Sequence, residues 1–221
     1  MAVAQAMRIG VAGVVLDADV TAPDQARGVV VFAHGSGSSR HSPRNRYVAG
    51  ELQAAGLGTV LADLLTEQEE RLDTRTGELR FDISLLAVRV IALTDWVTGY
   101  EQTAGLPVGL FGASTGAAAA LVAAAARPDP VRAVVSRGGR PDLAGDFLRL
   151  VRQPTLLIVG GNDDVVIELN RRAMEKLSAE TRLAIVPGAT HLFEEPGALE
   201  QVAALARGWF LRHLPAESRA G

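Results

Sequence analysis

Short apolar segments rich in β-branched residues alternate along this chain with stretches of helical periodicity. Residues 28–33 (GVVVFA) form a continuous apolar run, which is typical of a strand that is covered on both faces. Runs of the same kind recur at 58–62, 107–111, 131–135, 155–159 and 182–186. Strands that alternate with helices form parallel sheets with right-handed crossovers, so the pattern predicts a doubly wound α/β fold with a mostly parallel sheet.

The predicted helices lie between these runs. Apolar side chains on one face predict helices over 44–55, 116–126, 169–177 and 199–209, and another that begins after Asp82. The Asp82 side chain can cap the N-terminus of its helix, and Gly56 can end the first helix in the left-handed conformation. Each helix then carries the chain back to the edge of the sheet at which the next parallel strand begins.

Two segments break the regular alternation. Residues 14–20 alternate apolar and polar side chains, which predicts an edge hairpin with the residues around Ile9. The segment from Thr66 to Phe81 is charged and non-periodic, and predicts a long surface loop. We expect a single domain over residues 1–214 and a disordered tail over residues 215–221.

Composition excludes several classes of function. The net charge of −3, without a long run of one sign, argues against a nucleic-acid or anionic-membrane partner. The chain has no cysteine, which excludes disulfides and thiolate chemistry. No clustered histidine and carboxylate spacing suggests a metal, so we expect neither metal nor cofactor. The N-terminus lacks the pattern of a secretory signal, and we expect a cytoplasmic protein whose oligomeric state, monomer or homodimer, stays open.

The strongest local motif is Gly-Ala-Ser-Thr-Gly at residues 112–116, directly after an apolar run and before a helix. A serine on such a sharp strand-to-helix turn needs small neighbours two positions away on either side. Its hydroxyl then stands at the positive end of the helix, where developing negative charge is stabilised. We interpret Ser114 as a nucleophile, with a simple glycine-rich turn as the alternative.

A serine hydroxyl needs an adjacent base, and the chain offers four histidines. His191 follows the last predicted strand at the carboxyl edge of the sheet, where chemistry in open α/β folds is found. We therefore expect His191 to be the general base, with a structural loop histidine as the alternative. His34 is expected to organise the loop after its strand, and His213 lies in the last helix.

The base needs a carboxylate that orients it. Asp163 and Asp164 both follow the run at 155–159, and we favour Asp163 because the Gly160–Asp163–Val166 spacing turns the chain back into a helix. The other aspartate is expected to cap that helix or to be solvated. The resulting order is serine, aspartate, histidine, each after a different parallel strand.

Acyl transfer also needs donors for an oxyanion. One is expected to be the backbone N–H of Thr115, directly after the nucleophile. The second is expected from the glycine-rich loop His34–Ser39, where we favour Ser36. The alternatives are a flexible loop or a phosphate cradle, although the ending of a P-loop is missing.

Three further residues are candidates for substrate contacts. Arg137 and Arg140 follow the run at 131–135, and guanidinium groups suit a substrate carboxylate. Salt bridges to Asp142 or to the Thr66–Phe81 loop are the alternative, and the one we favour. His41 lies in a polar loop, where an exposed side chain is favoured over a substrate contact.

At these residues the chain resembles the dienelactone-hydrolase-like branch of the α/β-hydrolase superfamily. The stretches FAHGSGSS, FGASTG, LLIVGGNDDVV and PGATHLFEEPG carry the resemblance, which covers nearly the whole chain. It implies an α/β-hydrolase fold whose triad positions match Ser114, Asp163 and His191. Dienelactone hydrolase itself uses a cysteine nucleophile, so its activity on dienelactone does not carry over. Similar stretches also occur beside phosphoribosyltransferase domains, and we expect no such domain here.

These features together predict a serine hydrolase that cleaves small carboxylic esters through an acyl-enzyme. Only residues 136–153 separate two of the predicted strands, which is too short for a large cap domain and predicts an open site for small, soluble esters. A thioesterase or lactonase would present the same residues, and a catalytically idle binding protein with this fold is the alternative from another class.

Overall fold

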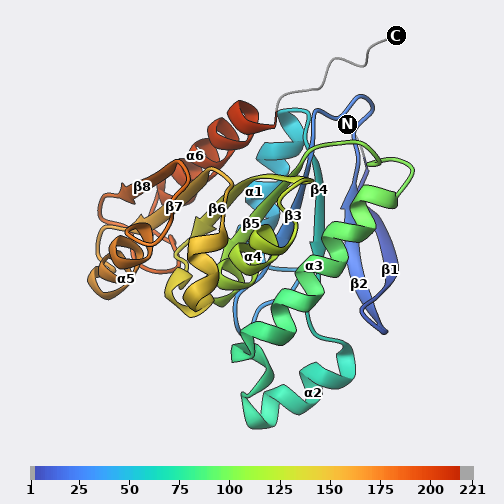
Figure 1. The fold of residues 1–221 in the computed structure, drawn as a ribbon, viewed down its shortest axis with the longest axis horizontal. Helices are drawn as coiled ribbons and strands as arrows, with labels where there is room; N and C mark the ends of the chain where they lie inside the picture. The colour runs from blue at the N-terminus through green and yellow to red at the C-terminus, as the bar shows by residue number, and fades with distance from the viewer. Residues whose placement is uncertain (1–2, 215–221) are drawn as a thin grey trace.

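The computed structural model describes residues 3–214, so the predicted tail over 215–221 lies outside the described residues (Figure 1). One eight-stranded sheet runs through the molecule in the order β1-β2-β4-β3-β5-β6-β7-β8. The strands from β3 to β8 are parallel, whereas β2 pairs antiparallel with β1 and β4. The strands are β1 (Gln5–Val11), β2 (Val14–Thr21), β3 (Val29–Ala33), β4 (Gly58–Ala62), β5 (Val108–Ala113), β6 (Val131–Arg137), β7 (Thr155–Gly160) and β8 (Thr181–Val186). The mostly parallel sheet and the edge hairpin are confirmed.

Helices cover both faces of this sheet (Figure 1). The α-helices are α1 (Pro43–Ala54), α2 (Glu67–Thr76), α3 (Ile83–Gly99), α4 (Thr115–Ala126), α5 (Asp164–Met174) and α6 (Ala198–His213). Two 3-10 segments, η1 (Leu79–Phe81) and η2 (Pro141–Leu150), complete the order. Helices α1 and α6 share one hydrophobic core with the sheet, while α3 and α4 share the other. Between β6 and β7 the chain forms only η2, so a large cap domain is absent from the described residues, as predicted.

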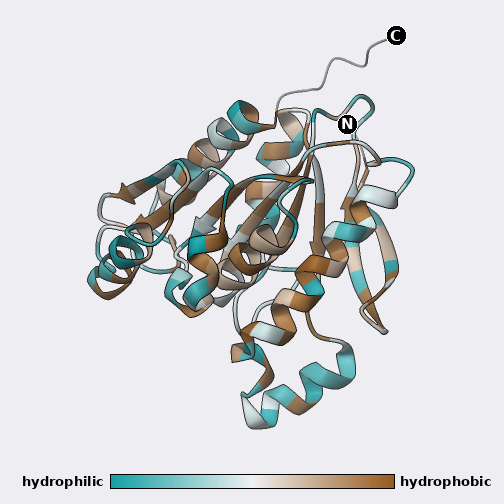
Figure 2. Cartoon of the chain, in the orientation of Figure 1, coloured by the Kyte–Doolittle hydropathy of each residue, from teal (hydrophilic) through white to brown (hydrophobic). Residues whose placement is uncertain are grey.

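The central strands are apolar because both of their faces are covered. Every residue of β3, β4, β5 and β7 is buried, and these strands are strongly hydrophobic in Figure 2. The rings of Phe32 and Phe111 contact each other at 4.8 Å between centroids on the α1 and α6 side. On the other side, the small alanine side chains of α4 allow this helix to lie close to the sheet. The close approach of α4 fixes the position of the turn before it.

The predicted loop from Thr66 to Phe81 is wrong, because this segment forms α2 and η1. Thr66 and Glu69 make a capping box at the start of α2, and Gly77 ends the helix with φ +68°. An Arg71–Glu67 ion pair one turn apart adds support along the helix surface. The helix is polar on nearly all sides (Figure 2), so it lacks the apolar periodicity on which the prediction relied.

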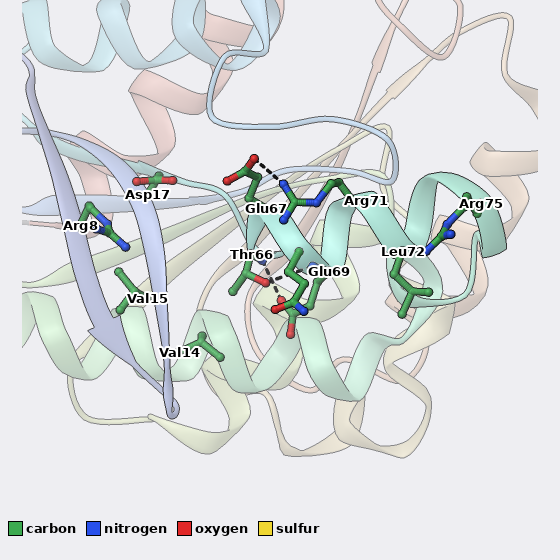
Figure 3. A pocket seen from close by; sticks show the side chains of 11 residues that line it. Arg8, Val14, Val15, Asp17, Thr66, Glu67, Glu69, Arg71, Leu72 and Arg75 are labelled. Atoms are coloured by element: carbon green, nitrogen blue, oxygen red, sulfur yellow. Dashed lines mark hydrogen bonds and ion pairs between the residues drawn. The ribbon is translucent and has the colours of Figure 1, made fainter.

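An open groove of about 1080 Å³ separates α2 from the edge hairpin (Figure 3). Arg8 and Val15 of the hairpin line one side of it, and Leu72 and Arg75 of α2 line the other. The candidate site residues are not among those that line this groove. This groove lies on the surface between α2 and the hairpin, apart from the site described below.

One buried carboxylate ties α2 to η1. The Asp73 side chain accepts hydrogen bonds from the Arg80 backbone N–H at 3.0 Å and from its Nε at 2.6 Å. Burial acts to raise the pKa of Asp73, but the hydrogen bonds and the charge of Arg80 outweigh it and hold that pKa below its ordinary value. A carboxyl with a lowered folded pKa stabilises the fold above its unfolded pKa, and this contribution is lost as the pH falls through the folded pKa.

We predict that Asp73→Asn destabilises the α2–η1 segment locally by about 2 kcal/mol, because hydrogen bonds to an ionised group are lost. Hydrogen exchange of the α2 amides measures the effect, and it should shrink at acid pH, where the wild-type carboxylate is itself protonated. The control is Arg71→Gln, which removes only an exposed ion pair and should change little. Equal exchange rates in the two variants would contradict this role of Asp73.

Candidate active site

The candidate residues gather at one edge of the sheet. Ser114 follows β5, Asp163 follows β7 and His191 follows β8, while Arg137 ends β6. The carboxyl ends of parallel strands meet at the same edge, which is where open α/β sheets bind ligands. The order of the strands puts β6 and β7 between the serine and the histidine, so the loops after β5 and β8 have to reach across the ends of these two strands.

Ser114 sits on a sharp, strained turn between β5 and α4. Its backbone has φ 51° and ψ −122°, a conformation that a non-glycine residue adopts only when its surroundings impose it. A Cβ atom on Gly112 would overlap the backbone of Ala117, and one on Gly116 would overlap the carbonyl oxygen of Ala33. Both neighbours must therefore be glycine for β5, α4 and β3 to approach this closely.

Backbone groups at the end of β6 and just after it hold this turn in place. The Ser114 N–H donates to the Arg137 carbonyl at 3.2 Å, and the Ser114 carbonyl accepts from the Arg140 N–H at 3.1 Å. Thr115 is the first residue of α4, where backbone N–H groups have no acceptor within the helix. The N–H groups at this helix end are thus suited to stabilise negative charge beside the serine.

The structure pairs His191 with Asp163. His191 Nδ1 lies 2.7 Å from Asp163 Oδ2, and Asp164 instead begins α5. With Nδ1–H donating to the carboxylate, the neutral ring keeps Nε2 as the atom that can accept a proton. Gly160 makes the pairing possible, because a Cβ there would overlap the carbonyl oxygens of Ala189 and Thr190.

The imidazole borders the residues that hold the serine turn. Gly138 has φ +51°, and a Cβ on it would lie 3.1 Å from the His191 carbonyl oxygen and 3.6 Å from ring atom Cε1. The preceding residue, Arg137, is the one whose carbonyl binds the Ser114 N–H. Contacts through Arg137 and Gly138 thus bring the His191–Asp163 pair close to the Ser114 turn. No hydrogen bond joins the Ser114 hydroxyl to the His191 ring in the described structure, and the roles of the three residues in catalysis stay a prediction.

The predicted oxyanion loop is fixed by His34. Its Nδ1 lies 2.9 Å from the Gly35 carbonyl oxygen, and its Nε2 accepts from the Leu64 N–H at 3.0 Å, as expected for a histidine that organises this loop. Burial lowers the pKa of His34, which keeps the ring neutral. The carbonyl of a trans peptide points away from the next N–H, so the Ser36 N–H points away from the His34 ring. A Cβ on Gly35 would lie 2.9 Å from the Ser114 Cβ, so this loop borders the serine.

The three candidates for substrate contacts lie in different surroundings. Arg140 makes a two-pronged ion pair with Asp142, at 2.9 and 2.8 Å, so the salt-bridge alternative holds for it. His41 is exposed, with Nδ1 3.1 Å from Arg46 Nη2, and it lines a hollow of about 700 Å³ beside the oxyanion loop. Arg137 is buried and makes no such pair with Asp142.

Sequence reasoning missed several residues that shape this edge. Gly138 and Phe193 bring the histidine loop onto the end of β6, and Asn162 donates to the Gly188 carbonyl at 2.9 Å. Phe193 is buried with φ 57°, which is rare for an aromatic residue. The Gly138-Gly139 pair and the Gly-Gly-Asn run were the available signals, because both mark backbone turns.

Among residues 3–214, no group of three or more histidine, cysteine or carboxylate side chains is arranged to hold a metal ion. Within the same residues, none of the helices combines the length and the apolar character needed to cross a bilayer.

The fold and the arrangement at this edge define a class of protein. A mostly parallel eight-stranded sheet, with a serine turn after β5 and a His–Asp pair after β8 and β7, is the arrangement of an α/β-hydrolase. The model of the dienelactone hydrolase family matches residues 16–212. The chain belongs to the dienelactone hydrolase family, and it is a hydrolase of that type.

Solved structures agree with this assignment. A dienelactone hydrolase from Anabaena variabilis is 58% identical, covers 96% of this chain and 98% of its own, and superposes with a TM-score of 0.94. Est1E from Butyrivibrio proteoclasticus has a TM-score of 0.79 over 95% of this chain and 98% of its own, but at 16% identity it supports the fold alone.

The curated relatives are longer proteins. Two Mycobacterium tuberculosis proteins that carry the name phosphoribosyl transferase are 63% identical over 195 residues, which is 88% of this chain. The match covers 43% of each of these proteins, so the chain spans less than half the length of the curated relatives it matches.

The close packing around Gly116, two residues after Ser114, generates a prediction about stability. Gly116→Ala should destabilise the protein by at least about 2 kcal/mol, because the new methyl group meets the Ala33 carbonyl in a packed core. Gly50→Ala, in the middle of α1 with open space around it, should instead stabilise by about 0.5–1 kcal/mol. Urea denaturation of both variants measures the difference, and a neutral Gly116→Ala would refute the close approach.

Proposed function

We propose that this chain is a serine hydrolase that cleaves small carboxylic esters through an acyl-enzyme on Ser114. The observation that carries the proposal is the 2.7 Å contact between His191 Nδ1 and Asp163 Oδ2, at a ring that borders the strained serine turn. This contact orients the imidazole and leaves Nε2 to act on the hydroxyl. In this proposal the protein acts in the cytoplasm on a diffusible ester, without cofactor, metal, nucleic acid or membrane surface.

The first half of the reaction forms the acyl-enzyme. His191 Nε2 takes the proton of the Ser114 hydroxyl as its oxygen attacks the ester carbonyl carbon. Asp163 stabilises the imidazolium that forms. The tetrahedral intermediate then collapses, and His191 returns the proton to the departing alkoxide, so that the alcohol leaves and the acyl group stays on Ser114.

The second half releases the acid. Water gives a proton to His191 Nε2 and attacks the acyl carbonyl, and the collapse of the second intermediate returns the proton to the Ser114 oxygen. In both halves the negative oxygen is stabilised by the Thr115 N–H and the Ser36 N–H. The hydrogen bonds of His34 support the second donor, because they set the orientation of the Gly35–Ser36 peptide.

The limited cover over the serine favours small substrates. The chain between β6 and β7 forms only the short segment η2. The longer connection that contains α2 and η1 comes after β4, not between β6 and β7. The same residues could also attack a thioester or a lactone. Comparing the rates of hydrolysis of esters, thioesters and lactones distinguishes these activities. Phosphoribosyl transfer, named for the longer relatives, is not proposed, because more than half of their length lies outside the match.

A fluorophosphonate probe tests whether the serine is reactive. We predict that the probe labels Ser114 covalently, that Ser114→Ala abolishes labelling, and that the same variant loses hydrolysis of p-nitrophenyl esters of short acyl chains. Labelling that persists in Ser114→Ala, or a folded protein that neither reacts nor hydrolyses any ester or thioester, would favour the idle binding protein. Near-ultraviolet circular dichroism controls for folding.

The two adjacent aspartates offer a matched pair for the triad. Asp163→Asn should lower kcat by about 10⁴-fold, because the amide favours the wrong tautomer of His191. Asp164→Asn, one residue further and not bonded to the ring, should keep kcat within about 3-fold, since it removes only a surface charge at the start of α5. Equal losses in the two variants would show that the 2.7 Å contact does not serve catalysis.

A further inference from the structure

The predicted oxyanion loop, residues 34–39, is bound at both of its ends by the two residues that follow β4. At its start, His34 Nε2 accepts from the Leu64 N–H at 3.0 Å. Directly after the loop, the Arg40 N–H donates to Asp63 Oδ1 at 2.7 Å, and Arg40 Nη1 donates to Asp63 Oδ2. The Asp63 carboxylate therefore binds both the backbone and the side chain of Arg40.

The part of the loop between these ends depends on them for its position. Residues 35–39 consist of glycine and serine, so they contain no apolar side chain that could anchor the loop in the core. Gly37 is exposed and adopts φ +66°, and the Ser38 N–H donates to the Gly35 carbonyl at 3.2 Å. A short segment with two glycines is conformationally permissive. The direction of the Ser36 N–H is therefore set by the anchors at the two ends.

A small movement of this loop changes the distance between the second oxyanion donor and the serine. A Cβ on Gly35 would lie 2.9 Å from the Ser114 Cβ and 3.1 Å from the Ala113 carbonyl oxygen, so the loop lies directly against the serine turn. An oxyanion donor acts only within about 2.7–3.1 Å of the negative oxygen. A misplacement of about 1 Å is enough to lose much of its contribution.

Asp63 and Arg40 form a partly buried ion pair beside a second carboxylate. Their side chains are 21% and 22% exposed, so solvent screens the pair less than it screens a fully exposed one. Asp19 of β2 lies 3.8 Å from Arg40 Nε, which has no hydrogen-bond partner, and accepts from Arg46 Nη2 at 2.7 Å. Asp19 thus attracts the same guanidinium without a hydrogen bond to it, whereas Asp63 is hydrogen-bonded to Arg40 twice.

We propose that Asp63 is a positioning residue for ester hydrolysis. Through Arg40 it fixes the end of the oxyanion loop, which keeps the Ser36 N–H directed at the negative oxygen of the tetrahedral intermediate. The hydrolytic role rests on the proposed function, whereas the anchoring of the loop stands on the hydrogen bonds of Asp63 themselves. Asp63 needs no contact with the substrate in this role, because it acts on the loop.

The kinetics of Asp63→Asn test the proposal. The amide keeps the shape of the side chain but loses the charge that binds the guanidinium. Both kcat and kcat/KM for p-nitrophenyl acetate should fall by about 10–100-fold, because an interaction made only in the transition state is weakened. Asp19→Asn should keep both within about 3-fold, since it removes a charge that is not hydrogen-bonded to Arg40. Equal losses in the two variants, or an unchanged kcat in Asp63→Asn, would overturn the proposal.

A transition-state analogue gives a readout that a general loss of stability would not change. The Ser114 oxygen adds to the carbonyl carbon of a trifluoromethyl ketone, its proton passes to His191, and the ketone oxygen becomes the oxyanion. The inhibition constant should rise in Asp63→Asn by about the factor by which kcat/KM falls. An inhibition constant that stays unchanged while kcat/KM falls would show that Asp63 does not act on the oxyanion donors.

A double-mutant cycle tests whether Asp63 acts through Arg40. Arg40→Gln should lower kcat in the same direction as Asp63→Asn, and the double variant should lose little more than Asp63→Asn alone. Losses that multiply fully in the double variant would show that the two residues act separately, which would contradict the proposed route.

Hydrogen exchange separates the anchoring of the loop from the hydrolase activity. The Ser38 and Arg40 amides should exchange about 10-fold faster in Asp63→Asn, because the anchor at the end of the loop is weakened, and at wild-type rates in Asp19→Asn. Faster exchange in a protein that cleaves no ester would refute the proposed function alone. Ester hydrolysis by the wild type, with exchange and kcat both unchanged in Asp63→Asn, would refute the inference alone.

Discussion

The close approach of three backbone segments at Gly116 is the constraint on which the rest of this structure depends. No side-chain atom fits between α4 and the carbonyl of Ala33 at the end of β3, so the β5–α4 turn is held directly against the sheet. That contact forces Ser114 into φ 51°, and it brings the loop after β3 to within contact of the serine. The strain at one residue is maintained by the packing of a whole helix.

The other loops meet this turn through backbone contacts rather than through long side chains. Gly138 and Gly160 leave room for the loop after β8, and the pairing of His191 with Asp163 follows from that placement. The same crowding has an electrostatic consequence, because it encloses Arg137 under Phe193 while its neighbour Arg140 reaches Asp142. A strained serine, an oriented histidine and an enclosed cation thus arise from one packing arrangement.

The sequence predicted the strands and most helices because their burial leaves a periodic apolar pattern, as in the run at 28–33 and the helix after Asp82. Helix α2 was missed because a capping box and surface ion pairs stabilise it, and neither produces an apolar stripe. The positions of Ser114 and His191 followed from motifs at strand ends, and the spacing argument for Asp163 agrees with the observed contact. Arg137 ends β6 and contacts the Phe193 ring, whereas Arg140 lies three residues further and pairs with Asp142. The contact between Arg137 and Phe193 joins distant parts of the chain, so no local sequence pattern encodes it.

The central claim is that the Ser114 oxygen carries the acyl group during turnover. The direct measurement mixes the enzyme with p-nitrophenyl pivalate, whose bulky acyl group leaves slowly, then quenches the mixture in acid and maps the modified peptide by mass spectrometry. The account predicts a burst of p-nitrophenol equal to the enzyme concentration and a pivaloyl group on Ser114. Hydrolysis with the acyl group on another residue, or turnover that continues unchanged in Ser114→Ala, would contradict it.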